Sequence, residues 1–185
     1  MKIIFLGSQG SGKSTQAKML AEKLNLPWIE MGQLLRDTSS QNDPRAFEIK
    51  KALDIGNLAP DKLVIEALRD RLSRPDCKNG YVLDGFPRNY AQLEGLDHDI
   101  DTVFYISVSD NEGIRRLVLR SRSDDTLAVI TQRLENYHKL TQPLLDYFKD
   151  KGILEEVDGE RSIEEIASDI NARLAKWRQN KESQK

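Results

Sequence analysis

The sequence is poor in the features that mark secreted, thiol-based or membrane-embedded proteins. Its 185 residues include a single cysteine, Cys77, which excludes an internal disulfide and a site built from several thiolates. The apolar run at residues 3–6 is too short for a signal-peptide core. No stretch reaches the roughly 20 apolar residues of a membrane span. We therefore expect a soluble, cytoplasmic protein without a membrane partner, in which Cys77 is inert.

A strong excess of charge of one sign is also missing. Lysine and arginine number 28 against 30 aspartates and glutamates, which gives a formal net charge of −2. No run of like charge is long enough for a nucleic-acid-binding arm. The two histidines have no cysteine or histidine neighbours at metal-ligand spacing. These absences argue against nucleic-acid partners and leave room for a local basic cleft that binds nucleotides.

Strand and helix patterns alternate along the chain, which is typical of an α/β protein with a parallel sheet. We expect strands at residues 2–6, 27–30, 80–84, 102–108 and 152–157. We expect helices at 13–24, 32–38, 45–54, 60–73, 110–120, 125–151 with a bend at Pro143, and 162–177. Ser162 and Glu165 form a capping box for the last helix, and residues 180–185 are expected to fray. The sequence thus predicts one monomeric domain, residues 1–185, with a doubly wound five-stranded parallel sheet and helices on both faces.

The most informative segment is residues 7–14, which read GSQGSGKS between the first expected strand and the first expected helix. It fits G-x-x-x-x-G-K-[ST], the pattern of a phosphate-binding loop (P-loop), in the context that this motif requires. Glycines let successive backbone N–H groups converge on phosphate oxygens, and the helix N-terminus adds partial positive charge. We expect Lys13 to reach the β- and γ-phosphates of a nucleotide and the Ser14 hydroxyl to bind Mg²⁺.

A second informative segment is residues 80–88, which read GYVLDGFPR. Asp84 leaves the end of a buried strand, where a carboxylate can hold the water shell of Mg²⁺ beside a phosphate loop. Arg88 follows a stiff Phe-Pro turn and offers forked donors to phosphate oxygens. Without the P-loop, the Asp-Gly pair is equally well explained as an ordinary turn at the end of a strand.

Together these segments resemble the nucleoside monophosphate kinases, and the adenylate kinases most closely, over about residues 1–160. The resemblance implies transfer of the γ-phosphoryl group of ATP to AMP with Mg²⁺ as cofactor, giving two ADP. Such an enzyme positions and neutralises two polyphosphates. It needs no general base, because the attacking phosphate oxygen is already ionised.

The resemblance also implies an acceptor site in a small helical insert at residues 31–60 and in the segments that follow it. The matching segments are MGQLLR at 31–36, GNLAPD at 56–61, and Gln92, which matches the glutamine that reads the adenine of AMP. The implied AMP-binding residues are Met31, Gly32, Arg36, Asn57, Leu58, Gly85, Arg88, Gln92 and Arg133.

The implied donor site follows from the P-loop and two later segments. Its ATP-binding residues are Gly10, Ser11, Gly12, Lys13, Ser14, Thr15, Arg120 and Gly159, with Arg120 over the adenine. The implied catalytic residues are Lys13, Asp84, Arg88, Arg122 and Arg133, where Arg122 and Arg133 neutralise the group in flight. We expect Ser14 to bind the metal directly and Asp84 to bind it through water.

Departures from the family pattern leave alternatives open. Residues 119–126 make only a vestigial lid, so we expect more ATP hydrolysis than in relatives with a long lid. Met31 and Gln33 replace the usual threonine and aspartate, which keeps a kinase for CMP, UMP or a deoxynucleotide as the nearest alternative. The KST sequence at 13–15 fits a P-loop kinase for a small metabolite, and the short lid fits a nucleotide-binding regulator without catalysis.

Overall fold

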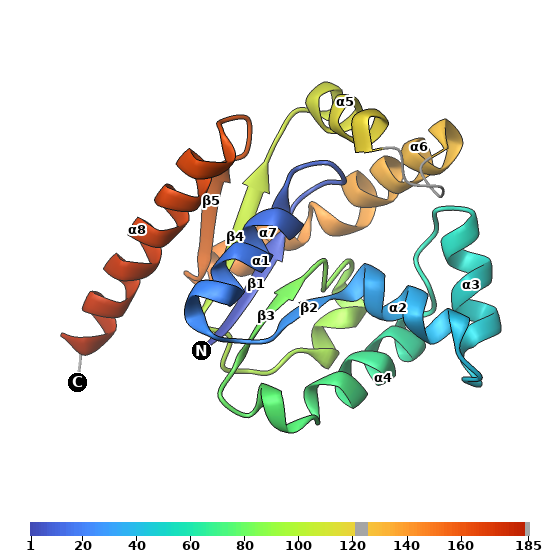
Figure 1. The fold of residues 1–185 in the computed structure, drawn as a ribbon, viewed down its shortest axis with the longest axis horizontal. Helices are drawn as coiled ribbons and strands as arrows, with labels where there is room; N and C mark the ends of the chain where they lie inside the picture. Colours follow the sequence, from blue (N-terminus) through green and yellow to red (C-terminus); the bar gives the residue numbers. More distant parts are fainter. Residues whose placement is uncertain (121–125, 184–185) are drawn as a thin grey trace.

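The fold is a single five-stranded parallel sheet wrapped by helices, as the sequence predicts (Figure 1). The computed structural model describes residues 1–120 and 126–183. The strands lie in the order β2-β3-β1-β4-β5. Their bounds are Lys2–Leu6 (β1), Trp28–Glu30 (β2), Tyr81–Asp84 (β3), Thr102–Ser107 (β4) and Leu154–Asp158 (β5). Because the chain moves from the central β1 to one edge and later to the other, the sheet is doubly wound and has a ligand crevice at the carboxyl ends of its strands.

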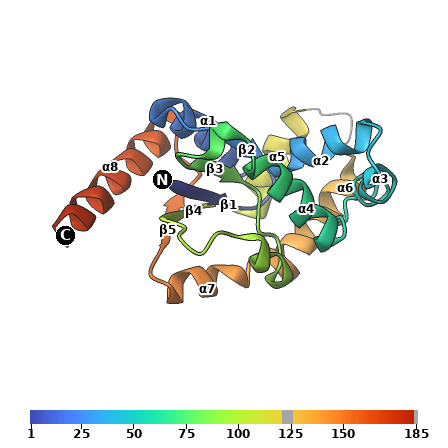
Figure 2. The ribbon, with the colours of Figure 1, turned by 90° about the horizontal axis from the view of Figure 1, so that it is seen from below.

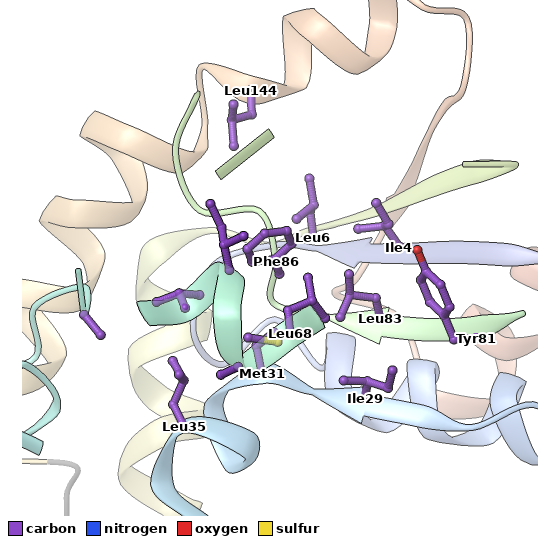
Figure 3. Packing of buried hydrophobic residues seen from close by; sticks show 14 of the residues in the cluster. Ile4, Leu6, Ile29, Met31, Leu35, Leu68, Tyr81, Leu83, Phe86 and Leu144 are labelled. Atoms are coloured by element: carbon purple, nitrogen blue, oxygen red, sulfur yellow. The ribbon is translucent and has the colours of Figure 1, made fainter. Parts of the chain in front are cut away.

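The two faces of the sheet bury alternate residues of the same strands, as the period of a strand requires. Ile3 and Phe5 of β1 face α1 (Lys13–Leu24) and α8 (Ile163–Glu182). Ile4 and Leu6 face α4 (Asp61–Leu72) and α7 (Leu144–Asp150). Figure 2 shows α1 and α8 at the upper left of the sheet and α7 below it, and Figure 3 shows Leu6, Phe86 and Leu144 in the core on the α4 and α7 side. Both faces are therefore covered, and the sheet is a rigid platform for the loops at its carboxyl edge.

Two groups of helices lie beside this platform. Helices α2 (Met31–Ser40) and α3 (Ala46–Asp54) connect β2 to α4, and they lie at the right of Figure 1. Helices α5 (Asp110–Arg120) and α6 (Leu127–Asn136) share a small apolar cluster of Leu117, Ile130 and Leu134. Gly56 follows the end of α3, and a Cβ at this position would stand 2.9 Å from the carbonyl oxygen of Val129 in α6. The two groups therefore approach each other closely across the carboxyl edge.

The predicted helix at 125–151 is divided in the structure. A π-helical turn at Tyr137–Thr141 follows α6, and α7 begins after Pro143. The N–H of Gln142 donates to the carbonyl of Tyr137, five residues earlier, at 2.8 Å. The predicted bend at Pro143 is confirmed. The wide turn before it accommodates a residue that has no N–H to donate and whose ring crowds the preceding turn.

The last helix differs from the prediction at its end only. Ser162 and Glu165 form the predicted capping box. The helix continues to Glu182, so the expectation that the chain frays from residue 180 is wrong for residues 180–182. Lys181 lies 4.3 Å from the Trp177 ring centroid and 2.7 Å from a carboxylate oxygen of Asp101, and these contacts hold the final turn. In the described ranges, no helix combines the length and apolar character needed to span a bilayer.

Candidate active site

One cavity, of about 530 Å³, gathers most of the predicted site residues at the carboxyl edge of the sheet. They come from the P-loop, from α2 and the turn after α3, from the end of β3, and from α5 and α6. The predicted residues that line it are Gly10, Ser11, Gly12, Lys13, Ser14, Thr15, Gly32, Arg36, Asn57, Asp84, Gly85, Arg88, Arg120 and Arg133. Residues that are far apart in the sequence thus face one space.

The P-loop depends on glycine at two positions. Gly10 and Gly12 have φ angles of 81° and 87°, in the left-handed region that other residues rarely adopt. A Cβ at Gly10 would also run into the carbonyl group of Gly113 in α5. Helix α1 begins directly after Gly12. Its first N–H groups have no partner within the helix, so they are available to an anion at this end.

Lys13 is folded back over the P-loop. Its Nζ donates a hydrogen bond of 3.0 Å to the carbonyl oxygen of Ser8. Burial lowers the pKa of Lys13, the charge of Asp84 opposes that shift, and Arg88 and Arg120 lower the pKa further. These cations converge on the same space, and a polyanion bound between them would relieve their repulsion.

Asp84 is the buried acid of the site. Its residue is 1% exposed, and neither carboxylate oxygen has a hydrogen-bond partner within the described chain. Burial raises the pKa of Asp84, and the charge of Lys13 and the neighbouring hydroxyl of Ser14 oppose the shift. A hydrated divalent cation would supply both donors and positive charge to these oxygens. In residues 1–120 and 126–183 no group of three or more His, Cys, Asp or Glu side chains could hold a metal by itself. The buried oxygens of Asp84 therefore fit a hydrated cation that binds beside a phosphate.

The guanidinium groups of Arg36, Arg88 and Arg133 line the same cavity as the P-loop. Arg88 Nε donates to the carbonyl oxygen of Gly85 at 2.9 Å. Burial lowers the pKa of Arg88; Asp84 opposes the shift, and Arg133 and Arg36 add to it. Such crowding of like charges is typical of a site that binds a strongly negative ligand.

Arg36 is held by two acceptors on its own side of the cleft. Its Nε and Nη2 donate to Oε1 of Gln33 at 3.2 and 3.0 Å. Its Nη2 also lies 3.3 Å from Oε1 of Glu30. A Cβ at Gly32 would stand 3.4 Å from Nη1 of Arg36, so glycine leaves room on that side. The guanidinium is thus oriented before any ligand binds.

Three charged residues that line the cavity were not predicted from the sequence: Glu30, Arg116 and Arg161. Arg116 precedes Arg120 by one turn of α5, and its Nη1 reaches the carbonyl oxygen of Ser11 at 3.4 Å. Its position four residues before a predicted site arginine was a usable signal. Arg161 and Glu30 had no such signal, because their place in the site follows from the β5–α8 turn and from the sheet register.

Four predicted residues do not line this cavity: Met31, Leu58, Gln92 and Gly159. Met31 is 1% exposed and packs in the core on the α4 and α7 side of the sheet, because the first turn of α2 turns it toward Leu68 and Leu35 (Figure 3). The backbone N–H of Gly159 donates to the carbonyl oxygen of Ser107, and a Cβ there would stand 2.7 Å from Ile106. Gly159 therefore packs against β4 and supports the turn, while Arg161 lines the cavity.

Gln92 is also buried away from the cavity surface. Its Oε1 accepts from the backbone N–H of Arg88 at 2.8 Å, and its Nε2 donates to Asp61 at 2.8 Å. Both ends of its amide are thus engaged, and its reading of adenine stays a prediction. Arg122 lies outside the described residues, and so does most of the predicted lid at 119–126.

A parallel sheet with a P-loop, a buried acid and converging arginines at its carboxyl edge defines a P-loop phosphotransferase. The family model for adenylate kinase matches residues 5–153. The chain is 36% identical to the adenylate kinase of Methanocella arvoryzae over 214 residues, which covers 95% of this chain and 99% of that protein. It is 41% identical to the adenylate kinase of Leptospira biflexa over 180 residues, with 91% and 97% covered. The chain belongs to the adenylate kinase family.

Proposed function

We propose that this protein transfers the γ-phosphoryl group of ATP to AMP and so produces two ADP. The observation that carries the proposal is one cavity in which a P-loop, Asp84 and arginines from five separate segments face one another. Family membership supports the same reaction. The triphosphate of ATP and the phosphate of AMP need this density of positive charge where they meet. The transition state spreads negative charge over the transferred group.

On the donor side, the backbone N–H groups of residues 10–15 and the ammonium group of Lys13 hold the β- and γ-phosphates. The hydroxyl of Ser14 and, through water, the carboxylate of Asp84 would hold Mg²⁺. The unpartnered, buried oxygens of Asp84 support this assignment. When bound, Mg²⁺ neutralises charge on the phosphates. Lys13 leaves the Ser8 carbonyl and follows the nucleotide, because a phosphate oxygen is a stronger acceptor for an ammonium group.

On the acceptor side, Arg36 and Arg88 bind the AMP phosphate, and Arg133 neutralises the group in flight. The shared cavity of Arg36, Arg88 and Arg133, and the influence of the other two on the pKa of Arg88, support a place where the two phosphate groups meet. No residue is needed as a general base, since the attacking oxygen is ionised near neutral pH.

The two arginines of α5 divide the donor nucleotide between them. Arg120 affects the pKa of Lys13, which favours a role near the phosphates. Arg116 lies against the outer side of the P-loop, at Ser11 and Gly12, which favours a role over the donor adenine. This assignment differs from the one that the family resemblance implied, in which Arg120 covers the adenine.

The insert at residues 31–60 acts as the flap over AMP, residues 119–126 act as a reduced lid, and the protein works as a cytoplasmic monomer. Asn136 of α6 supports the flap, since its Nδ2 donates to the carbonyl oxygen of Gly56 at 3.2 Å and to Oδ1 of Asn57 at 3.3 Å. These contacts connect the acceptor side to the helix that carries Arg133.

The test is diphosphate formation from ATP with AMP, CMP, UMP and GMP offered separately, with and without Mg²⁺. We expect turnover that requires Mg²⁺. We also expect a kcat/KM for AMP at least about tenfold above that for the other acceptors, because a site that hydrogen-bonds one base discriminates against the others. Turnover with CMP or UMP alone would overturn the assignment of the acceptor. ATP binding without transfer to any acceptor would overturn the reaction itself.

A further inference from the structure

An acidic residue stands at the acceptor side of this basic cavity without a role in the proposed reaction. Glu30 is the last residue of β2, and in the sheet it lies directly beside Asp84 of β3. In the part of the chain that the structure describes, Glu30 and Asp84 are the acidic residues that line the cavity. Asp84 faces the expected metal, but Glu30 is directed at Arg36.

Arg36 has one neutral partner, Gln33, and one charged partner, Glu30. Gln33 accepts from Nε and Nη2 of Arg36 and in turn donates from its Nε2 to Asp37 at 2.7 Å. Glu30 adds a carboxylate oxygen 3.3 Å from Nη2. The amide of Gln33 fixes the orientation of the guanidinium group by hydrogen bonds alone. The carboxylate of Glu30 adds a negative charge at the position where the acceptor brings its own.

The pair is shielded enough from water for its charge to matter. The side chains of Glu30 and Arg36 are 18% and 33% exposed. An ion pair in such a setting is screened less than one at an open surface. The charge of Glu30 also reaches further, since it opposes the lowering of the pKa that burial causes in Lys13 and in Arg88. A phosphate that binds Arg36 must therefore approach a carboxylate that already partners it.

We propose that Glu30 determines acceptor affinity as a counter-ion that competes with the acceptor phosphate for Arg36, while Gln33 keeps the guanidinium oriented in both states. This inference rests on the proposed function, in which Arg36 binds that phosphate. The competition sets acceptor affinity below the level that the arginines alone would give. It also favours a doubly charged phosphomonoester, because a singly charged ester displaces a carboxylate less effectively. The effect is expected to be largest on the acceptor side, where Glu30 contacts Arg36, and small on the donor side, where it acts on Lys13 only at a distance.

The test measures binding of AMP and, separately, of ATP to the whole protein by titration calorimetry, together with KM and kcat. Glu30→Gln keeps the shape of the side chain and removes its charge, so we expect the Kd for AMP to fall about threefold to tenfold. The Kd for ATP changes less than about twofold. Gln33→Ala is expected to act in the opposite direction and raise the Kd for AMP, because the guanidinium loses its orienting acceptor. Glu30→Asp retains the charge on a shorter side chain, so its Kd for AMP should lie between those of the wild type and Glu30→Gln.

Matched variants make the outcomes distinct. Glu48→Gln removes one negative charge from the exposed surface of α3 and should leave both affinities unchanged. In an Arg36→Gln background, Glu30→Gln should lose its effect on AMP. Unchanged or weakened AMP binding by Glu30→Gln, with a normal loss in Arg36→Gln, would overturn the competition and leave the proposed function intact. Equal tightening of ATP and AMP would mean that Glu30 acts through overall charge, which also overturns the proposal. No effect of Arg36→Gln on AMP would instead remove the assignment of Arg36 itself.

Discussion

The proposed donor and acceptor sides of the cavity are built by different means. The donor side is made of backbone: Gly10 and Gly12 adopt left-handed conformations, and α5 approaches Gly10 through Gly113. The acceptor side is made of side chains that hold one another, such as Gln33 and Glu30 on Arg36. A backbone site is fixed once the loop folds, whereas a side-chain site can be altered by exchanging one partner. We therefore expect donor phosphate binding to tolerate side-chain changes better than acceptor recognition does.

The largest expected effect concerns the donor side. Lys13→Met removes the ammonium group that follows the transferring phosphate, so kcat should fall by at least about a thousandfold. Lys18→Met, on the exposed face of the same helix, is the matched control and should keep full activity. The coupled assay for diphosphate formation measures both variants. Substantial turnover by Lys13→Met would mean that the backbone alone carries the donor side.

The next effect concerns the acceptor side. Arg88→Ala should raise the KM for AMP about a hundredfold, because it removes a partly buried, charge-assisted partner of the proposed acceptor phosphate. The KM for ATP should change less than about threefold. Arg69→Ala, on the exposed face of α4, controls for the loss of one positive charge. Equal rises in both KM values would erase the division into two sides.

A smaller effect tests whether the donor side depends on close backbone approach. Gly10→Ala introduces a Cβ that collides with the carbonyl group of Gly113, and we expect a loss of about 3 kcal/mol of stability with weaker ATP binding. Gly152→Ala is the control, since Gly152 also has a positive φ of 68°, but a Cβ there would meet no atom of the described chain within 4 Å. That variant should lose about 1 kcal/mol from backbone strain alone. Thermal unfolding separates the two, and equal losses would show that the contact between the loop and α5 does not matter.

The smallest effect concerns the link between the flap and α6. Asn136→Ala removes hydrogen bonds to the Gly56 carbonyl and to Asn57, so the KM for AMP should rise about fivefold with little change in the KM for ATP. Glu135→Ala, exposed on the same helix, is the neutral control. An unchanged KM for AMP in Asn136→Ala would mean that the flap holds its position by other contacts.

The sequence-based predictions were accurate for features set by the local backbone and less accurate for contacts between side chains. The strands, the P-loop and the capping box at Ser162 were predictable, because each depends on residues that are adjacent in the chain. The π turn before Pro143 was not, because the pattern of apolar residues is nearly the same for both helical forms. Arg116 could have been predicted from its spacing to Arg120. Glu30 could not, because β2 reaches Asp84 only through the order of strands in the sheet.

The sequence by itself determined the local chemistry of this protein: a loop that can adopt positive φ angles, a helix that starts behind it, and a strand that ends in an acid. Only the tertiary structure decided which charges meet. It turned the amide of Gln92 toward Asp61 and Arg88, buried Met31 in the core, and set Glu30 against Arg36. The physical reason is the separation along the chain of the residues that interact. Backbone conformation is dictated by neighbouring residues, whereas the interaction between two charges depends on a distance in space that the packing of the sheet and its helices alone defines.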